Sequence, residues 1–202
     1  MSSEVQRWES RFAAPGYLFG KEPNAFLRAQ AHRLRPGQTA LSVADGEGRN
    51  GVWLAEQGLD VLAVDFAPSA IAKARALAAE RGVPLRTQQA DVTTWEWPHA
   101  EFDVVVAIFT QFVTPKGRTR MFEGMKRALK PGGWLFLEGY APKQLEYRTG
   151  GPSEVERLYT RELLSAAFGD LSSIEIDEYE REMSEGTAHT GRSALIDLVG
   201  RK

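Results

Sequence analysis

Short apolar runs alternate along the chain with segments in which apolar residues recur every three or four positions. The apolar runs predict strands at residues 39–44, 60–65, 85–90, 102–109 and 134–140. The segments between them predict helices at residues 49–57, 68–81 and 116–129. The stretch "FDVVVAIF" at 102–109 is apolar after its aspartate, which is typical of a strand covered on both faces. This alternation predicts an α/β fold with a doubly wound, mostly parallel sheet.

Both ends of the chain depart from this alternation. Before the first strand, the pattern predicts helices at residues 4–11 and 25–34, joined by a loop. After residue 140 it predicts a long loop at 141–154 and a helix at 161–168. Two strand-like runs follow at 171–182 and 192–200, with the turn-rich connection "MSEGTAHTG" and no helix between them. We therefore expect a seven-stranded sheet that ends in an antiparallel pair, within a single domain over residues 1–202.

Composition narrows the range of partners. The chain has 202 residues, 43% of them hydrophobic, and a formal net charge of -2, which suits one globular domain with a substantial core. The absence of cysteine excludes disulfides and thiolate metal ligands, and we predict no metal site. No basic run favours nucleic acid, and no apolar run approaches the ~20 residues of a membrane span. The polar N-terminus does not look like a signal peptide, so we expect a cytoplasmic protein, as a monomer or homodimer, with no membrane partner.

The stretch "ADGEGRNG" at residues 44–51 follows the first predicted strand and contains the G-x-G-x-x-G pattern of dinucleotide-binding turns. However, the carboxylates of Asp45 and Glu47 would oppose a pyrophosphate, whereas they suit the sulfonium and ammonium groups of S-adenosylmethionine. Glycines allow a ligand to approach the backbone, and the helix that follows offers amides to a carboxylate. The candidate cofactor residues in this stretch are Asp45, Gly46, Gly48, Arg49 and Asn50.

Acidic residues also end the second and third predicted strands. Asp65 is suited to accept hydrogen bonds from ribose hydroxyls, a feature that dinucleotide and S-adenosyl cofactors share. Asp91 is suited to bind an adenine amino group, and the apolar neighbours Phe66 and Val92 either sandwich that ring or simply pack. Each acid also has a structural alternative, since Asp65 can cap the helix that starts at Pro68 and Asp91 can cap the turn that follows it.

In this order, the motifs resemble those of class I S-adenosylmethionine-dependent methyltransferases. Within that group the chain is similar to the branch of tellurite-resistance B-type proteins and thiopurine methyltransferase relatives. The resemblance runs through "RWESRF", "YLFGKEPNAFL", "VADGEGRNGVWLAEQGLDVLAVDFAPSAI", "LKPGGWLFLEGYAP" and "EGTAHTGRSALIDLVGRK". It implies a Rossmann-like core over residues 37–202, with S-adenosylmethionine as cofactor and S-adenosylhomocysteine as product. It also implies methyl transfer to a small-molecule acceptor, such as a thiol or a chalcogen oxyanion.

The chain departs from the family pattern at two positions of the first motif. Ser42 and Ala44 stand where an acid and a glycine are common, so that Asp45 carries the charge.

The resemblance further implies an N-terminal helical flap over residues 1–36, which closes over the cofactor. Tyr17 and Phe19 of this flap are candidate substrate-binding residues, whereas we assign Trp8 to the core. Ile108 is a further candidate for the cofactor site, and Phe109 and Tyr140 are candidates for the substrate site.

The final turn-rich connection is expected to approach the acceptor. His189 and Arg192 are the candidate catalytic residues, as two cations for an anionic acceptor or with neutral His189 as the base for a hydroxyl or amine. Glu185 is a candidate to orient them.

Two alternatives remain open. An NAD-dependent oxidoreductase can use the same glycine motif, although the loop carboxylates and the lack of a second catalytic domain in the tail weigh against it. A non-catalytic module that binds an S-adenosyl ligand is compatible with the departures at Ser42 and Ala44.

Overall fold

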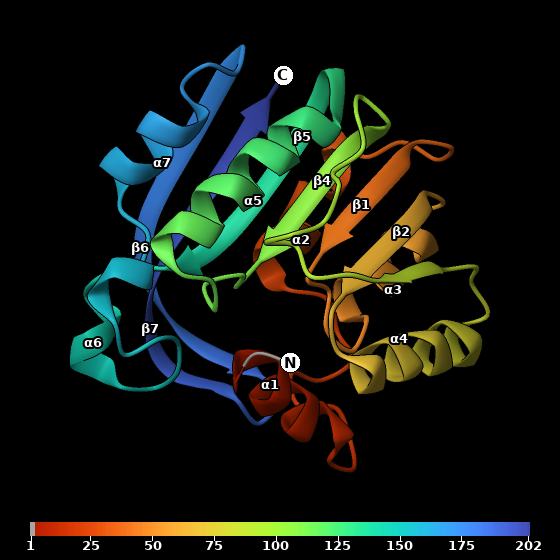
Figure 1. Cartoon of the computed structure of the whole chain (residues 1–202), viewed down its shortest axis with the longest axis horizontal. Coiled ribbons are helices and arrows are strands. Elements are labelled where there is room, and N and C mark those ends of the chain that lie inside the picture. The colour runs from red at the N-terminus through yellow and green to blue at the C-terminus, as the bar shows by residue number, and fades with distance from the viewer. Residues whose placement is uncertain (1–2) are drawn as a thin grey trace.

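A computed structural model describes residues 3–202 and shows one seven-stranded sheet with the strand order β3-β2-β1-β4-β5-β7-β6 (Figure 1). Neighbouring strands from β3 to β5 are parallel, whereas β7 runs antiparallel to both β5 and β6. The predicted sheet with an antiparallel C-terminal pair is therefore confirmed. The strands are β1 (Thr39–Val43), β2 (Asp60–Asp65), β3 (Arg86–Gln89), β4 (Phe102–Ile108), β5 (Leu129–Tyr140), β6 (Ser173–Glu185) and β7 (His189–Arg201).

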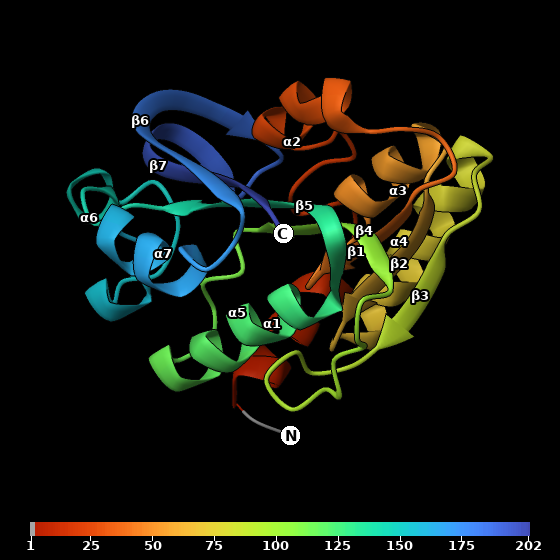
Figure 2. The ribbon, with the colours of Figure 1, turned by 90° about the horizontal axis from the view of Figure 1, so that it is seen from above.

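Helices cover both faces of this sheet. Figure 2 shows α2 and α3 on one face and α5 and α7 on the other. No helix within residues 3–202 has both the length and the apolar character needed to cross a bilayer. The helices are α1 (Ser3–Ala13), α2 (Ala25–Ala29), η1 (Gln30–Arg33), α3 (Arg49–Glu56), α4 (Pro68–Arg81), α5 (Pro115–Ala128), α6 (Gln144–Tyr147), η2 (Val155–Arg157) and α7 (Arg161–Phe168).

The apolar stretch of β4 supplies both layers of the core. Val104 and Val106 belong to the cluster that contains Leu54 of α3, whereas Val105 belongs to the cluster that contains Met125 of α5. Because successive side chains of a strand point to opposite faces, a strand between two helical layers needs apolar residues at every position. This requirement explains why the sequence here does not alternate.

The C-terminal hairpin is longer than the sequence predicts. Its pairing continues to Glu185 opposite His189, so the connection shrinks from the predicted 183–191 to residues 186–188. Gly186 makes this tight turn with φ +64°. Its α-carbon also lies so close to the backbone of residues 18–20 that an added Cβ would come within 2.4 Å of the Leu18 carbonyl oxygen. His189 is therefore the first residue of a strand and not part of a loop.

Smaller differences between the predicted and the observed elements concern three segments. The predicted helix at 25–34 is α-helical only to Ala29 and continues as a 3-10 turn. Residues 130–133, expected as a turn, lie within β5, where the pairing with β4 shifts register. The predicted loop at 141–154 contains the short helix α6.

Helix α1 lies below the carboxyl ends of the parallel strands (Figure 1). It is tied to α4, because Glu9 accepts hydrogen bonds from both the amide and the hydroxyl of Ser69. The chain that follows α1 is held by Lys73 of α4, whose Nζ donates to the carbonyl oxygens of Ala14 and Gly16 at 2.7 and 2.6 Å. In open α/β sheets, ligands bind at the carboxyl ends of the strands, which is the space that α1 covers here.

Candidate active site

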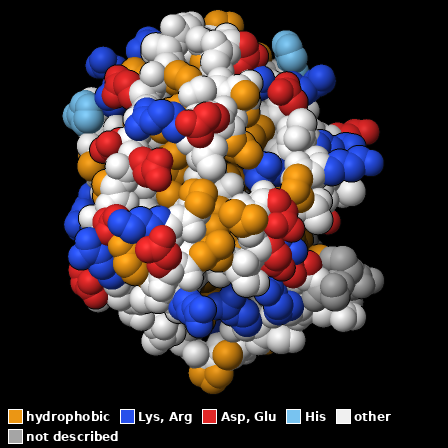
Figure 3. Space-filling model, turned by 90° about the vertical axis from the view of Figure 1, so that its left-hand side faces the viewer, with side chains coloured by type: hydrophobic (Ala, Val, Ile, Leu, Met, Phe, Trp, Pro, Cys, Tyr) orange, Lys and Arg blue, Asp and Glu red, His pale blue; other side chains and the backbone are white. Residues whose placement is uncertain are grey.

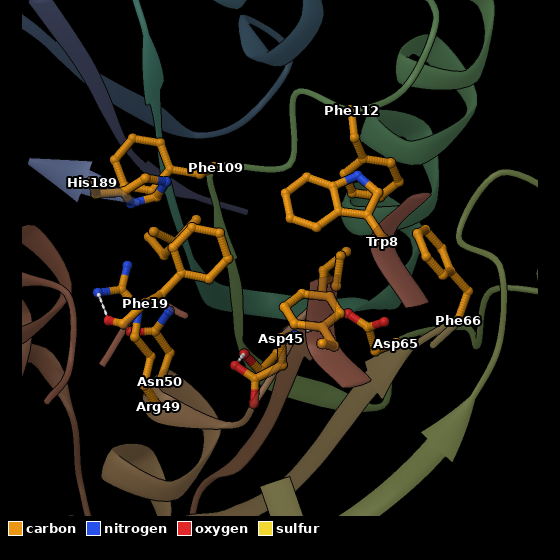
Figure 4. Close-up of a pocket in the computed structure, with 16 residues that line it drawn as sticks. Trp8, Phe19, Asp45, Arg49, Asn50, Asp65, Phe66, Phe109, Phe112 and His189 are labelled. Atoms are coloured by element: carbon orange, nitrogen blue, oxygen red, sulfur yellow. Dashed lines mark hydrogen bonds between the residues drawn. The ribbon is translucent and has the colours of Figure 1, made fainter. Parts of the chain in front are cut away.

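A cavity separates α1 from the ends of β1, β2 and β4, and we call it the glycine-loop cavity. Figure 4 shows His189 and Phe109 on one side of it and Trp8, Phe112 and Phe66 on the other, with Asp45 and Asp65 at its base. Its lining residues are Trp8, Phe12, Phe19, Ser42, Val43, Ala44, Asp45, Gly46, Arg49, Asn50, Asp65, Phe66, Ile108, Phe109, Phe112 and His189.

Asp45 is buried against the first turn of α3. One of its carboxylate oxygens accepts hydrogen bonds from Ser42 Oγ at 2.6 Å and from the Gly51 amide at 3.1 Å. An added Cβ at Gly51 would lie 2.4 Å from the other oxygen, so glycine is required for this contact. Burial raises the pKa of Asp45 to about 7, although both hydrogen bonds favour the charged form.

Asp65 ends β2 and holds the glycine loop in place. It accepts hydrogen bonds from the amides of Gly46 at 2.9 Å and Ala67 at 2.8 Å. Burial raises the pKa of its carboxyl to about 6. The base of the cavity thus carries two carboxyl groups that are easily protonated without a ligand and that a nearby cation would ionise.

The other residues of the loop have structural roles. Glu47 points away from the cavity, because it pairs with Lys73 at 2.8 Å and accepts the Leu18 amide at 2.7 Å. Only one of the two loop acids therefore faces a ligand. Gly48, predicted to bind the cofactor, does not line the cavity. Its φ is +94°, and an added Cβ would lie 2.7 Å from Ala74, so this glycine allows α3 and α4 to pack closely.

Two residues that line the cavity have left-handed backbone conformations although they are not glycines. Ala44 has φ +49° and Phe109 has φ +55°. Such a conformation costs roughly 1–2 kcal/mol for a residue with a Cβ. It also explains why glycine is common at the position of Ala44. Strain of this kind is typical of ligand sites, where surrounding structure fixes the backbone.

A second cavity, which we call the arginine-rimmed cavity, lies behind a wall of rings. The two cavities share Trp8, Phe19, Phe109, Phe112 and His189. Residues 150–154 form part of the second cavity. They belong to the loop predicted at residues 141–154, for which the sequence predicts no function. Its other lining residues are Arg7, Arg11, Gln111, Tyr140, Arg157 and Ala188.

His189 lies in the wall between the cavities. Its ring centroid is 4.4 Å from the centroids of both Phe19 and Phe109. Burial, and to a lesser degree the positive charge of Arg49, lowers the pKa of His189 to about 3. The imidazole is therefore neutral at pH 7, which corrects the prediction that it is one of two cations. Its Nδ1 atom is buried and has no hydrogen-bond partner among residues 3–202.

The structure does not bring Arg192 to either cavity. Residues three apart on a strand point to opposite faces, so Arg192 of β7 points away from His189. Its exposed side chain pairs with Glu180 at 2.7 Å. Glu185, expected to orient both residues, instead pairs with Arg49 at 2.7 Å. The predicted cation pair is therefore absent because the hairpin turn is shorter than expected.

Three further candidates lie outside the two cavities. Tyr17 packs against α4, and its hydroxyl donates to the Lys73 carbonyl oxygen at 3.1 Å. Val92 is fully buried in the core. Asp91 accepts hydrogen bonds from the amide and hydroxyl of Thr93, which is the capping role noted as its alternative. Asp91 borders a third cavity, which adjoins the glycine-loop cavity because both include Phe66 and Phe112.

Sequence reasoning missed several residues of the site. Trp8, which we assigned to the core, lines both cavities, and Phe12 and Phe112 line the glycine-loop cavity. Arg7 and Arg11 were not considered, although residues four apart on a helix share one face. That spacing was the available signal. The remaining candidates, which are Arg49, Asn50, Phe66, Ile108, Phe19, Phe109 and Tyr140, lie in one or both cavities.

Comparison with known proteins agrees with this geometry. Residues 40–133 match the methyltransferase domain family. A solved S-adenosylmethionine-dependent methyltransferase from Methanosarcina mazei superposes with a TM-score of 0.66 at 20% identity, over 89% of this chain and 98% of that one. The chain therefore contains a segment that matches the methyltransferase domain family, and its fold is shared with solved S-adenosylmethionine-dependent methyltransferases. This result favours the predicted S-adenosyl cofactor over the dinucleotide alternative.

Two further proteins resemble this chain. The chain is 30% identical over 138 residues to a glycine/sarcosine N-methyltransferase of Halorhodospira halochloris, in an alignment that covers 65% of this chain and 47% of that protein. The chain thus spans about half the length of the curated relatives it matches. TehB from Haemophilus influenzae has a TM-score of 0.70 at 14% identity, over 98% of this chain and 67% of that one. The second likeness shows a shared fold, and the tellurite-resistance branch remains a prediction.

Proposed function

We propose that this methyltransferase transfers the methyl group of S-adenosylmethionine to a small-molecule acceptor. The cofactor binds in the glycine-loop cavity, and the acceptor binds in the arginine-rimmed cavity. One observation carries this proposal: a cavity with more acids than arginines and a cavity with more arginines than acids meet at a common wall of rings, which includes Phe19, Phe109 and His189. A cationic methyl donor and an electron-rich acceptor would meet at this wall.

The residues of the glycine-loop cavity fit the cofactor. Buried Asp45 suits the ammonium and sulfonium groups, and Asp65 suits the ribose hydroxyls. The amides of Arg49 and Asn50 are the first of α3, so they have no partner within the helix and can bind a carboxylate. The next amide, that of Gly51, already donates to Asp45. The adenine ring would extend along Phe66 towards the third cavity.

We further propose that residues 1–36 act as a flap on a single core formed by residues 37–202. Trp8, Phe12 and Phe19 of this segment form one wall of the glycine-loop cavity. Closure of the wall would exclude water from the reacting groups.

Methyl transfer requires alignment of the acceptor atom, the methyl carbon and the sulfur more than it requires acid–base catalysis. S-adenosylmethionine supplies a methyl group on a positively charged sulfur that is a good leaving group. A lone pair of the acceptor forms the new bond to carbon as the carbon–sulfur bond breaks, and sulfur keeps that electron pair. Holding two reactants in line is worth ~7–11 kcal/mol in favourable cases.

The state of His189 bears on which acceptor is used. A neutral imidazole whose pKa is lowered to about 3 is a weak base. An acceptor that arrives already deprotonated, such as a thiolate or a chalcogen oxyanion, needs no base and therefore fits best. An amine is the second candidate, because a relative 30% identical is named a glycine/sarcosine N-methyltransferase.

Titrations with S-adenosylmethionine, S-adenosylhomocysteine and NAD(H) test the cofactor. A ligand at ~100 times its dissociation constant adds about 2.7 kcal/mol of stability, or about 5–11 °C in melting temperature for a chain of this size. We expect this shift with both S-adenosyl ligands and none with NAD(H). Release of S-adenosylhomocysteine with thiols, selenite, tellurite or glycine then tests turnover. Stabilisation by NAD(H) alone would refute the proposal.

A further inference from the structure

Three arginines border the arginine-rimmed cavity, and only one lacks a counter-charge. Arg7 pairs with Glu4 at 2.8 Å, and Arg157 donates to the Phe112 carbonyl oxygen at 3.0 Å and lies 3.4 Å from Glu4. Arg11 has neither an ion pair nor a hydrogen bond within residues 3–202. Lys and Arg side chains form a row near the bottom of the face in Figure 3, at the height of α1.

The guanidinium of Arg11 is held in place by aromatic rings. It lies 4.4 Å from the ring centroid of Trp8 and 6.0 Å from that of Phe19. Arg11 is an exposed residue at the rim, and partial burial together with the neighbouring charge of Arg7 lowers its pKa, so no acid compensates its positive charge locally. The same charge makes the smallest of the contributions that shift the pKa of His189, after burial, Arg49 and Glu185.

Three buried polar atoms in the lining of the two cavities also lack partners among the described residues. They are Trp8 Nε1, Tyr140 Oη and His189 Nδ1. Buried polar groups in folded proteins are nearly always hydrogen-bonded. Unpartnered groups beside an uncompensated cation therefore indicate a ligand that brings both a negative charge and hydrogen-bonding atoms.

We propose that the acceptor carries a carboxylate apart from its nucleophilic atom, and that Arg11 binds this carboxylate at the rim of the cavity. The inference rests on the proposed methyl transfer and specifies its substrate class. A guanidinium presents a planar fork of donors, which matches the two oxygens of a carboxylate, and the contact with the Trp8 ring restricts where that fork lies. Tyr140 and His189 would then face the nucleophilic end of the molecule.

A pair of thiols that differ only in a carboxylate tests this inference. Thiophenol and 2-mercaptobenzoate are titrated into the protein with and without S-adenosylhomocysteine, by calorimetry, and both are offered as acceptors with S-adenosylmethionine. We expect wild type to bind 2-mercaptobenzoate about 10–100 times more tightly, because hydrogen bonds between charged groups are strong. Arg11→Gln should abolish the difference, and Arg11→Lys should keep part of it. The control Arg75→Gln removes an exposed arginine of α4 that bonds to Thr87 and should keep all of it.

Equal affinity of wild type for the two thiols would overturn the inference, as would a preference that survives in Arg11→Gln or failure of both thiols to bind. Melting temperatures of both Arg11 variants identify any loss of folding. If S-adenosyl ligands do not bind, the proposed function fails, while the titration without cofactor still decides the role of Arg11. An Arg11-dependent preference without methyl transfer supports the carboxylate site and contradicts the proposed turnover.

Discussion

Binding of S-adenosylmethionine should release protons, because its positive groups approach carboxyls that are partly protonated. The pKa of Asp45 is raised to about 7 and that of Asp65 to about 6, in both cases mainly by burial. A cation beside Asp45 favours its charged form and lowers its pKa. Hydrogen bonds from ribose hydroxyls do the same for Asp65.

The size of the release follows from these two values. At pH 6.5, Asp45 with a pKa of about 7 is about three-quarters protonated, and Asp65 with a pKa of about 6 is about one-quarter protonated. If the ligand ionises both, about one proton leaves per molecule bound at pH 6.5, and almost none leaves at pH 8.5. Affinity should accordingly rise with pH, by about tenfold per unit near pH 6.5 and more steeply below pH 6, and level off above 8.

Calorimetry at pH 6.5 in two buffers with different ionisation enthalpies measures the release directly. Asp45→Asn should reduce it to the share of Asp65, about one-quarter of a proton. The matched control Asp60→Asn removes an exposed acid at the other end of β2 and should leave the release unchanged. No proton release at pH 6.5, or affinity that falls as pH rises, would refute the assignment of Asp45 to the cationic part of the cofactor.

Four further predictions concern individual positions. Ala44→Gly relieves a left-handed φ and should raise the free energy of unfolding by about 1 kcal/mol in urea melts, and any loss would contradict the strain. Gly48→Ala should cost about 2 kcal/mol or more, because its Cβ meets α4, whereas the control Gly82→Ala, with open space around it, should cost about 1. Burial raises the pKa of Glu138 to about 8, so the stabilisation that its protonated form gives at low pH is lost as pH rises through 8. Glu138→Gln should flatten this loss in thermal melts from pH 6 to 9. Arg192→Ala should leave kcat and KM within about twofold, since its side chain is exposed and outside both cavities, and a larger loss in a turnover assay would return it to the site.

The strands were predictable because their signal is local. Val104, Val105 and Val106 face both helical layers, and a continuous apolar run is the direct sequence record of that double burial. The glycine loop was also readable, since Gly46 and Asp65 follow strand ends that must lie side by side in a parallel sheet. In both cases, each segment carries its own short-range signal.

The second cavity was not predictable in this way, because its walls come from distant parts of the chain. Arg11, Phe112 and Gly150 come from three distant segments of the chain, and no short-range pattern marks them. The neutral state of His189 likewise follows from burial between Phe19 and Phe109, which a sequence does not record. The position of Arg192 depended on the length of one turn, since a shift by one residue reverses the face of a strand.

Helix α1 borders both cavities at once, and this has a consequence for the kinetics of the proposed methyl transfer. Trp8 and Phe12 cover the glycine-loop cavity, while Arg7 and Arg11 on the same helix border the other. If S-adenosylmethionine enters by displacing this helix, the same movement disassembles the proposed acceptor rim. The cofactor should therefore bind first and S-adenosylhomocysteine leave last, so that added S-adenosylhomocysteine inhibits competitively against the methyl donor and noncompetitively against the acceptor.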